Sequence, residues 1–405
     1  MSVNDWVQRS FGFGGVFRVV KWENASQRSI LHLEPDRDKL RCPDCGRADL
    51  ICRGRALRRL RTLPVGSTPT ALAIPVPRVF CNHCHALKQV HLPFASSRRS
   101  YTRAFERYAL ELCRFATIQD VAHHLHVGWD MIKDIYQRNL KRRFKKLSWD
   151  NLRCIAIDEL CVGKGHFITL VLDLETGAVV HVGEGRSGQA LQGFWRRIRM
   201  IADQIEAVAM DMSGAFQAAV REYLPDAQIV FDHFHLIQLF NEKLSDLRRE
   251  VQREAEGPLQ KQVLKGTRWL LLKNPQNLND ARNERQHLEE ALQLNLPLAT
   301  AYYLKEDLRQ IWNQPGKPAA ELFLNDWIRR AEASGIRMLK QFAKTLQTYR
   351  SGILAWYDYP ITTAALEGTN NKIKTLQRKA YGFRDHEFFK LRIYFIHELK
   401  YALTG

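Results

Sequence analysis

The sequence lacks any apolar run close to the ~18 residues that a membrane-spanning helix requires, which excludes an integral membrane protein. Its first residues, MSVNDWVQRSFGFGG, lack the basic and apolar regions of a secretory signal, so we expect a protein of the reducing cytoplasm. Acidic residues are few relative to basic ones, with 43 Asp and Glu against 61 Lys and Arg and a net charge of +18. This excess predicts a polyanionic partner, for which nucleic acid, a ribosome and a membrane surface all qualify.

Wholesale disorder is also excluded, because hydrophobic residues make up 45% and charged residues 26% of the chain, as in ordinary folded proteins. At ~100–200 residues per domain, the 405 residues correspond to two to four domains.

In a reducing compartment, the eight cysteines are better interpreted as thiols or metal ligands than as a disulfide framework. Cys42 and Cys45 form one CxxC pair, and Cys81 and Cys84 form a second. Two such pairs complete a tetrahedral site of four sulfurs, so we predict structural Zn²⁺. A redox CxxC motif and the replacement of one ligand by a nearby histidine are the alternatives; the histidines are His83, His85 and His91.

The 35 residues between the two pairs predict a β-hairpin, with strands over Leu50–Leu63 and Thr70–Val79. The first strand carries five arginines within nine residues, namely Arg53, Arg55, Arg58, Arg59 and Arg61. Several guanidinium groups on one strand face suit successive phosphates, so we predict a contact with DNA. A solvated surface is the structural alternative for such a charge run.

Residues 96–148 predict a helix-turn-helix domain. Apolar residues recur every three or four positions from Phe105 to Phe115, and Thr117 is placed to cap a short helix over Ile118–Leu125. A turn containing Gly128 then precedes a second helix over Asp130–Lys141, the member of this motif that enters the major groove. Residues 96–146 hold 12 Lys and Arg against 5 Asp and Glu, which favours DNA binding over an ordinary helical linker. The candidates for contact with the DNA backbone are Lys133, Arg138, Lys141, Arg142 and Arg143.

A region rich in strands begins near residue 149. Strands are predicted over Leu152–Asp158, His166–Asp173, Ala178–Gly183, Ile205–Asp211 and Gln228–Asp232. Helices are predicted over Gln189–Met200, over Ser213–Leu224 and from His235. This order, β-β-β-α-β-α-β-α, predicts a ribonuclease H-like α/β fold, in which right-handed connections place the fourth strand beside the first.

Asp158 and Asp211 each end a predicted strand, so we expect them to be neighbours at one edge of the sheet. Adjacent carboxylates repel each other and normally require a counter-charge, and oxygen ligands suit Mg²⁺ or Mn²⁺. Two such ions support an in-line phosphoryl displacement. The structural alternative is that strands often end in Asp because turns do.

A third carboxylate is expected from a helix near the end of the sequence. Residues 241–355 predict a helical insertion, with helices over Asp280–Leu294, Ala299–Trp312, Pro318–Ser334 and Ile336–Arg350. In the segment after it, Thr362 or Thr363 caps a helix that places Glu367 in its early turns. The Glu367 face also carries Asn370, Asn371 and Lys374, which with Arg378 and Lys379 are candidates for contact with DNA; a plain surface helix is the alternative.

Together these motifs resemble the ISL3 family of bacterial insertion-sequence transposases, which combine an N-terminal zinc-binding domain, a helix-turn-helix and a DDE catalytic domain. The resemblance rests on CPDC at 42–45, CNHC at 81–84, IAIDE at 155–159, AMDMSGAF at 209–216, VFDHFHLIQLFN at 230–241 and ALEGTNNKIKTLQRKAYGFRD at 365–385. It implies that Asp158, Asp211 and Glu367 form a metal-binding catalytic triad. Asp232 and His235 match a (Cys/Asp)-x-x-His element, which either supports the active site or anchors a strand to the following helix.

The resemblance also implies a DNA transposase that binds the terminal inverted repeats of its element and catalyses hydrolysis and strand transfer with Mg²⁺ or Mn²⁺. Its partners would be double-stranded DNA and further copies of the chain, in a homodimer or larger assembly on the bacterial nucleoid. The expected domains are a zinc-binding domain (1–95), the helix-turn-helix (96–148), a catalytic core in two parts (149–240 and 356–405) and the helical insertion (241–355). A catalytically silent DNA-binding regulator and a structure-selective nuclease are the alternatives.

Overall fold

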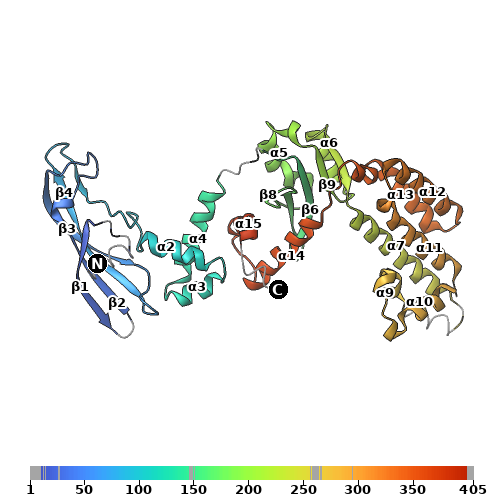
Figure 1. Cartoon of the computed structure of the whole chain (residues 1–405), viewed down its shortest axis with the longest axis horizontal. Helices are drawn as coiled ribbons and strands as arrows, with labels where there is room; N and C mark the ends of the chain where they lie inside the picture. Colours follow the sequence, from blue (N-terminus) through green and yellow to red (C-terminus); the bar gives the residue numbers. More distant parts are fainter. Residues whose placement is uncertain are drawn as a thin grey trace. The chain divides into compact units, whose positions relative to one another are not determined.

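The computed structural model describes residues 11, 13, 15–25, 28–145, 149, 151–255, 257, 264, 267–293 and 295–398. The chain forms two compact units (Figure 1): the first consists of residues 1–146 and 375–405, and the second of residues 147–374. Each unit contains its own five-stranded sheet together with helices, so the protein is α+β. No helix within the described ranges is long and apolar enough to cross a membrane.

The first unit begins with a sheet in the order β1-β2-β4-β3, with β5 paired to β4. Its strands are β1 (Phe17–Ala25), β2 (Arg28–Pro35), β3 (Leu50–Arg61), β4 (Thr70–Cys81) and β5 (Leu87–Gln89). The predicted hairpin is confirmed as the antiparallel pair β3–β4, whose register places Leu60 opposite Leu72. Both leucines are buried in a core that Phe17 of β1 also enters. Strands β1 and β2 are not among the predicted elements.

The helix-turn-helix follows in the same unit as α2 (Arg103–Leu112), α3 (Ile118–His124) and α4 (Trp129–Arg143). The predicted cap is confirmed: the Thr117 hydroxyl accepts from the Asp120 amide, while the Asp120 carboxylate accepts from the Thr117 amide. Such a reciprocal capping box satisfies two amide groups that a helix start otherwise leaves unpaired. Helix α15 (His386–Tyr394) packs on α4, where the Phe388 and Tyr136 rings lie 6.0 Å apart between centroids.

The second unit contains a sheet in the order β10-β9-β6-β7-β8. Its strands are β6 (Cys154–Gly163), β7 (His166–Asp173), β8 (Val179–Glu184), β9 (Ala207–Met210) and β10 (Gln228–Phe231). The first three are antiparallel, and β9 and β10 are parallel additions to β6, so the predicted place of the fourth strand beside the first is confirmed. The prediction that the first strand ends at Asp158 is wrong, because β7 continues to pair with β6 as far as Gly163.

The helices of the second unit fall into two sets. Around the sheet lie α5 (Gln192–Ile198) and α6 (Gly214–Tyr223), and α14 (Ala364–Lys379) begins here and ends in the first unit. The helical region consists of α7 (His233–Glu254), α9 (Arg268–Leu272), α10 (Glu284–Gln293), α11 (Leu296–Leu308), α12 (Lys317–Ala333) and α13 (Arg337–Leu354). The four helices predicted between residues 280 and 350 are confirmed with small shifts at their ends, except that Leu294 lies outside the described residues.

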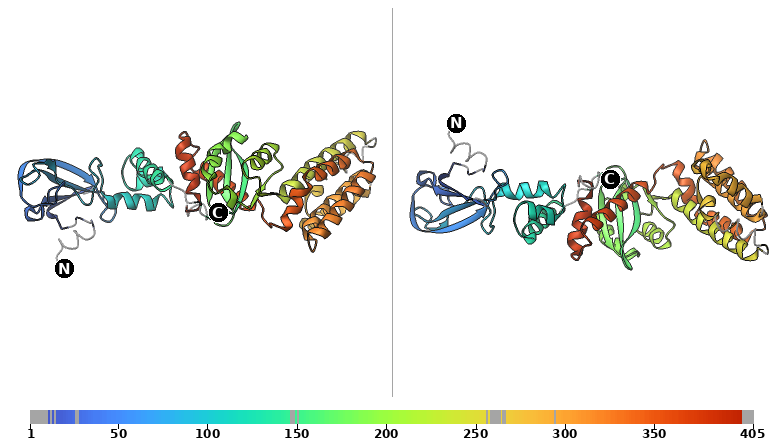
Figure 2. Two further views of the ribbon diagram at one scale, coloured as in Figure 1. Left: turned by 90° about the horizontal axis from the view of Figure 1, so that it is seen from above. Right: turned by 90° about the horizontal axis from the view of Figure 1, so that it is seen from below.

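The helical region packs directly against the sheet, and its helices lie alongside one another in the yellow and orange part of Figure 2. Helix α13 crosses β10 at Gly352, where a Cβ atom would stand 2.4 Å from the Phe231 ring and 3.2 Å from the Ile229 carbonyl oxygen. Deeper in the region, the fully buried Trp327 donates its indole N–H to the Leu304 carbonyl at 2.8 Å. One continuous apolar core therefore fixes the helical region to the edge strand of the sheet.

Candidate active site and DNA-binding elements

Three aspartates lie in or directly after three neighbouring parallel strands: Asp158 in β6, Asp211 after β9 and Asp232 after β10. The register pairs Ala156 of β6 with Ala209 of β9, and Phe231 of β10 with Met210 of β9. Continued in register, Asp158 lies beside Asp211 and Asp211 beside Asp232, because parallel strands keep a constant offset. The Asp232 amide donates to the Met210 carbonyl at 3.1 Å, which extends the ladder to this level. The expected juxtaposition of Asp158 and Asp211 thus follows from the register.

The Asp158 carboxylate is partly buried, and each of its oxygens accepts a hydrogen bond. One oxygen accepts from the Glu159 amide at 2.7 Å, and the other accepts from the Asn370 side-chain amide at 2.8 Å. Burial, and to a smaller degree the charge of Asp211, raise the pKa of Asp158. The two carboxylates therefore interact, and a bound cation would relieve their repulsion.

Asn370 joins the helix that carries Glu367 to this edge of the sheet. It is 8% exposed, and its Oδ1 atom has no hydrogen-bond partner. Glu367 lies one turn earlier on α14 and is exposed. Within the described ranges, the cysteine cluster is the only group of three or more His, Cys, Asp or Glu ligand atoms within 4.8 Å of one another. The structure therefore brings Asp158 and Asp211 together and places Glu367 on the adjacent helix, without closing the triad to that distance.

Asp232 accepts hydrogen bonds from the start of α14. Its Oδ2 atom accepts from the Thr363 amide at 2.6 Å and from the Thr363 hydroxyl at 2.7 Å, and its Oδ1 atom accepts from the Phe234 amide at 2.7 Å. Nδ1 of His235 lies 3.9 Å from Asp232, and the His235 ring is close enough to Asp158 to oppose part of the rise in the Asp158 pKa that burial causes. Asp232 is therefore an anchor between β10, α7 and α14.

The arginines predicted to meet DNA on β3 divide into two groups. Arg53, Arg55 and Arg59 are exposed. Arg58 donates to the Arg99 carbonyl at 2.7 Å, and Arg61 donates to the Leu125 carbonyl at 2.6 Å. The last two tie the sheet to the helix-turn-helix.

The basic residues predicted on α4 also divide. Lys133 pairs with Asp385 at 3.0 Å, and Arg138 bonds to the Tyr101 hydroxyl and pairs with Asp134 at 3.2 Å. The other three are exposed at the end of the helix: Lys141, Arg142 and Arg143. Arg143 also lies over the Phe395 ring, 5.3 Å from its centroid.

The polar residues predicted on the Glu367 face do not all point the same way. Asn371, Lys374, Arg378 and Lys379 are exposed. Asn370, grouped with them as a DNA contact, is instead buried against Asp158. The sequence contained a signal for this, because Asn370 falls between the buried Leu366 and Ile373 at intervals of four and three, on the apolar side of the helix.

The four paired cysteines form a compact cluster in the first unit. Their sulfurs all lie within 4.8 Å of one another, with 3.5 Å between Cys42 and Cys84 and 3.6 Å between Cys45 and Cys81. A tetrahedral zinc site with bonds of about 2.3 Å separates its sulfurs by about 3.8 Å, so the cluster supports a structural Zn²⁺. Backbone N–H groups of Cys45 and Asp44 lower the pKa of Cys42 to about 7, whereas burial and the neighbouring sulfurs raise the pKa of Cys45 and of Cys84.

Three family models match successive parts of the chain. A model described as the zinc-finger of transposase IS204/IS1001/IS1096/IS1165 matches residues 38–84, and one for the helix-turn-helix domain of transposase family ISL3 matches residues 90–138. The DDE transposase model of ISL3 matches residues 155–393, more than half of the chain. The chain belongs to the ISL3 transposase family.

Similarity to individual transposases extends over most of the chain. The ISL3 transposase described here is 31% identical over 383 residues to the transposase for insertion sequence element IS1001 of Bordetella parapertussis, covering 94% of both chains. It is 29% identical over 384 residues to the transposase for insertion sequence element IS1557 of Mycobacterium tuberculosis, covering 88% of this chain and 86% of the other. The protein is therefore an insertion-sequence transposase with zinc-finger, helix-turn-helix and DDE domains, an enzyme that acts on DNA.

Proposed function

We propose that this transposase binds the terminal inverted repeats of its own insertion sequence, hydrolyses a phosphodiester at each end and joins the released 3′-hydroxyl to target DNA. The observation that carries the proposal is the edge of the second sheet. Continuing the register of β6 and β9 by two residues brings Asp158 and Asp211 to the same level, and the Asn370 side chain donates from the helix of Glu367 to Asp158.

The order of strands supports a ribonuclease H-like catalytic core. Three antiparallel strands with two parallel additions agree with that topology. We assign the core to residues 149–240 and 356–405, the helical insertion to 241–355, the zinc-binding domain to 1–95 and the helix-turn-helix to 96–148. Residues 375–405 of this core belong to the first compact unit. In this division the insertion enters between the strand before Asp232 and the helix of Glu367.

Asp158, Asp211 and Glu367 would hold divalent cations, Mg²⁺ or Mn²⁺. The donor set fits, because all three offer carboxylate oxygens and Asn370 adds a buried, unpartnered amide oxygen beside them. When bound, these ions supply electrostatic stabilisation for an in-line phosphoryl displacement. Asp232 and Thr363 hold the start of α14, and Asn370 orients Asp158, so these three residues position the carboxylates.

DNA would meet the exposed basic residues first. These are Arg53, Arg55 and Arg59 on β3, Lys141, Arg142 and Arg143 on α4, and Lys374, Arg378 and Lys379 on α14, with Asn371 beside them. Arg58, Arg61, Lys133 and Arg138 would contact DNA only by giving up the intramolecular bonds described above. Because both ends of the element must be cut and joined together, we infer a homodimer or larger assembly on DNA, in the bacterial cytoplasm at the nucleoid.

The test is incubation of the purified protein with labelled element ends, a target plasmid and Mg²⁺. We expect strand-transfer products from the wild type, and none from Asp158→Asn, Asp211→Asn or Glu367→Gln, each with element-end affinity within about threefold of the wild type. Exposed Asp246→Asn serves as a matched carboxylate control that retains activity. Specific binding without cleavage would identify a regulator instead, and cleavage of branched DNA alone would identify a structure-selective nuclease. A Glu367→Gln protein that joins strands at the normal rate would overturn the triad.

A further inference from the structure

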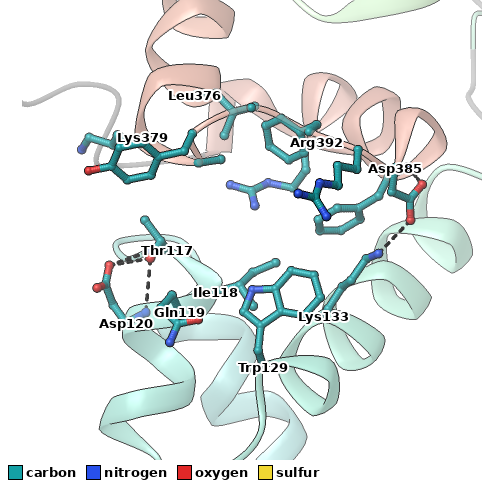
Figure 3. Close-up of a pocket in the computed structure, with 16 residues that line it drawn as sticks. Thr117, Ile118, Gln119, Asp120, Trp129, Lys133, Leu376, Lys379, Asp385 and Arg392 are labelled. Atoms are coloured by element: carbon teal, nitrogen blue, oxygen red, sulfur yellow. Dashed lines mark hydrogen bonds and ion pairs between the residues drawn. The ribbon is translucent and has the colours of Figure 1, made fainter.

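A cavity of about 1050 Å³ lies in the first unit, between the helix-turn-helix and the segment that ends α14 and forms α15 (Figure 3). Thr117, Trp129 and Lys133 line one wall, and Lys379 and Asp385 line the opposite wall. The ion pair between Lys133 and Asp385, 3.0 Å long, joins the two walls. The volume lies just above the range of about 300–1,000 Å³ typical of ligand sites.

Tyr381, also in the cavity lining, has an unusual backbone. Its φ angle is +52°, and the residue is 99% exposed. The Gly382 amide donates to the Gln377 carbonyl at 2.9 Å, which closes a helix end whose left-handed position is normally glycine. Here tyrosine takes that position, and an almost fully exposed ring gains little from packing in return. Backbone strain of this kind is typical of functional sites.

The chemistry of the walls favours a nucleic acid strand. The lining contains four basic side chains, Lys133, Lys379, Arg384 and Arg392, against two acidic ones, Asp120 and Asp385. Asp120 accepts from the Thr117 hydroxyl, and Asp385 is paired with Lys133. Because Arg392 is only 4% exposed, the exposed basic side chains of the lining are Lys379 and Arg384. Trp129 on the facing wall is 42% exposed. Exposed aromatic rings next to basic groups are the means by which proteins stack unpaired bases and pair with phosphates.

We propose that this cavity binds an unpaired DNA strand, with the rings of Trp129 and Tyr381 stacked on bases and the side chains of Lys379 and Arg384 facing phosphates. The inference rests on the proposed function, because strand cleavage at an element end frees a strand that can leave the duplex. It assigns to the first unit a single-strand site in addition to the duplex-reading helix-turn-helix.

The experiment measures the affinity of the full-length protein for a fluorescent oligothymidine and for a duplex element end, at one fixed salt concentration. Tyr381→Ala is expected to weaken binding of the single strand about 5- to 100-fold, the loss that accompanies removal of one base–aromatic stack. Tyr381→Phe keeps the ring and should bind within about twofold of the wild type. Duplex affinity should be the same in all three proteins. Equal single-strand affinity of Tyr381→Ala and wild type would overturn the proposal.

Two further variants separate binding from folding. Tyr381→Gly removes the ring but suits the left-handed backbone, so it should melt at or above the wild-type temperature and still lose single-strand affinity. Tyr303→Ala removes a 61% exposed tyrosine of the second unit and should change nothing. A loss as large in Tyr303→Ala would overturn the assignment to this cavity. Specific duplex binding and strand transfer by the wild type test the proposed function separately, so the two can fail independently.

Discussion

At the scale of single residues, Asp232 determines where the helix of Glu367 begins. Burial alone would raise its pKa, but the hydrogen bonds from Thr363 and the Phe234 amide outweigh burial and lower it. Asp232 is therefore ionised at neutral pH, and its two oxygens accept three hydrogen bonds from two different helices. This favours an anchoring role for the acid of the (Cys/Asp)-x-x-His element.

Replacing Asp232 by Asn is expected to loosen the start of α14. The substitution turns one carboxylate oxygen into an amide N–H donor. Either the amide and hydroxyl of Thr363 or the amide of Phe234 then lacks an acceptor, which should lower the free energy of unfolding by about 1–3 kcal/mol. Hydrogen exchange of residues 364–374 should become faster, and strand transfer should fall. Exchange at wild-type rates would contradict the anchoring role. Asp246→Asn, at an exposed acid paired with Arg249, should leave exchange in α14 unchanged.

Asn370 and the exposed Asn277 form a matched pair for a second test. Asn370→Ala removes the bond to Asp158 and should cost about 1–2 kcal/mol of unfolding free energy, together with most of the strand-transfer activity. Asn277→Ala changes an exposed asparagine of the helical region and should cost less than about 0.5 kcal/mol. Urea unfolding and a strand-transfer assay measure both effects. Indistinguishable variants would show that the contact with Asp158 has no role in positioning it.

At the scale of elements, the contact between α13 and β10 depends on Gly352. A methyl group there would stand 2.4 Å from the Phe231 ring, so Gly352→Ala is expected to destabilise the protein by about 1–3 kcal/mol through overpacking. Gly368→Ala, also in a helix, meets nothing within 4 Å and should be neutral or stabilising by up to about 1 kcal/mol. Denaturant unfolding of the two variants distinguishes them, and equal stabilities would contradict the close approach.

The cluster of Cys42, Cys45, Cys81 and Cys84 offers a second test at the scale of elements. The purified protein should contain one zinc ion per chain. Cys81→Ser should lose the metal together with affinity for element ends, because the fold of the zinc-binding domain depends on the metal. Cys52→Ser alters an exposed cysteine outside the cluster and should keep both. Metal analysis and a binding assay measure these outcomes. A Cys81→Ser protein with full zinc content would exclude this ligand set.

Elements whose hydrogen bonds join residues close in sequence could be predicted from the sequence. Features that depend on contacts between residues far apart in sequence could not. The Thr117 capping box and the β3–β4 hairpin depend on residues close in sequence, and the order of the second sheet follows from connection rules. The extension of β6 to Gly163 depends on pairing with β7. The apolar spacing of α14 indicates that Asn370 faces inward, but its partner Asp158 lies 212 residues away and could not be predicted from that spacing. The candidate triad was therefore predicted by motif and register, but the residues that position it required the tertiary structure.

At the scale of the whole molecule, the net charge of +18 predicts strongly salt-dependent DNA binding. The logarithm of the binding constant should fall linearly with the logarithm of salt concentration, with a slope near −0.9 for each phosphate neutralised. Changing Arg53, Arg55 and Arg59 together to Ala should make that slope shallower by about 2 to 3. Fluorescence anisotropy over a salt series measures it. An unchanged slope would exclude this strand from the interface.

The first unit is discontinuous in sequence, because it consists of residues 1–146 and residues 375–405. Helix α14 begins in the second unit and ends in the first. This arrangement restricts how such elements can evolve. A single crossover that replaced the 5′ part of the gene would combine α4 of one lineage with α15 of another. The packing faces of these two helices would then not match. A viable hybrid requires a compensating exchange at the tail, so end preference and chemistry should be inherited as a linked trait.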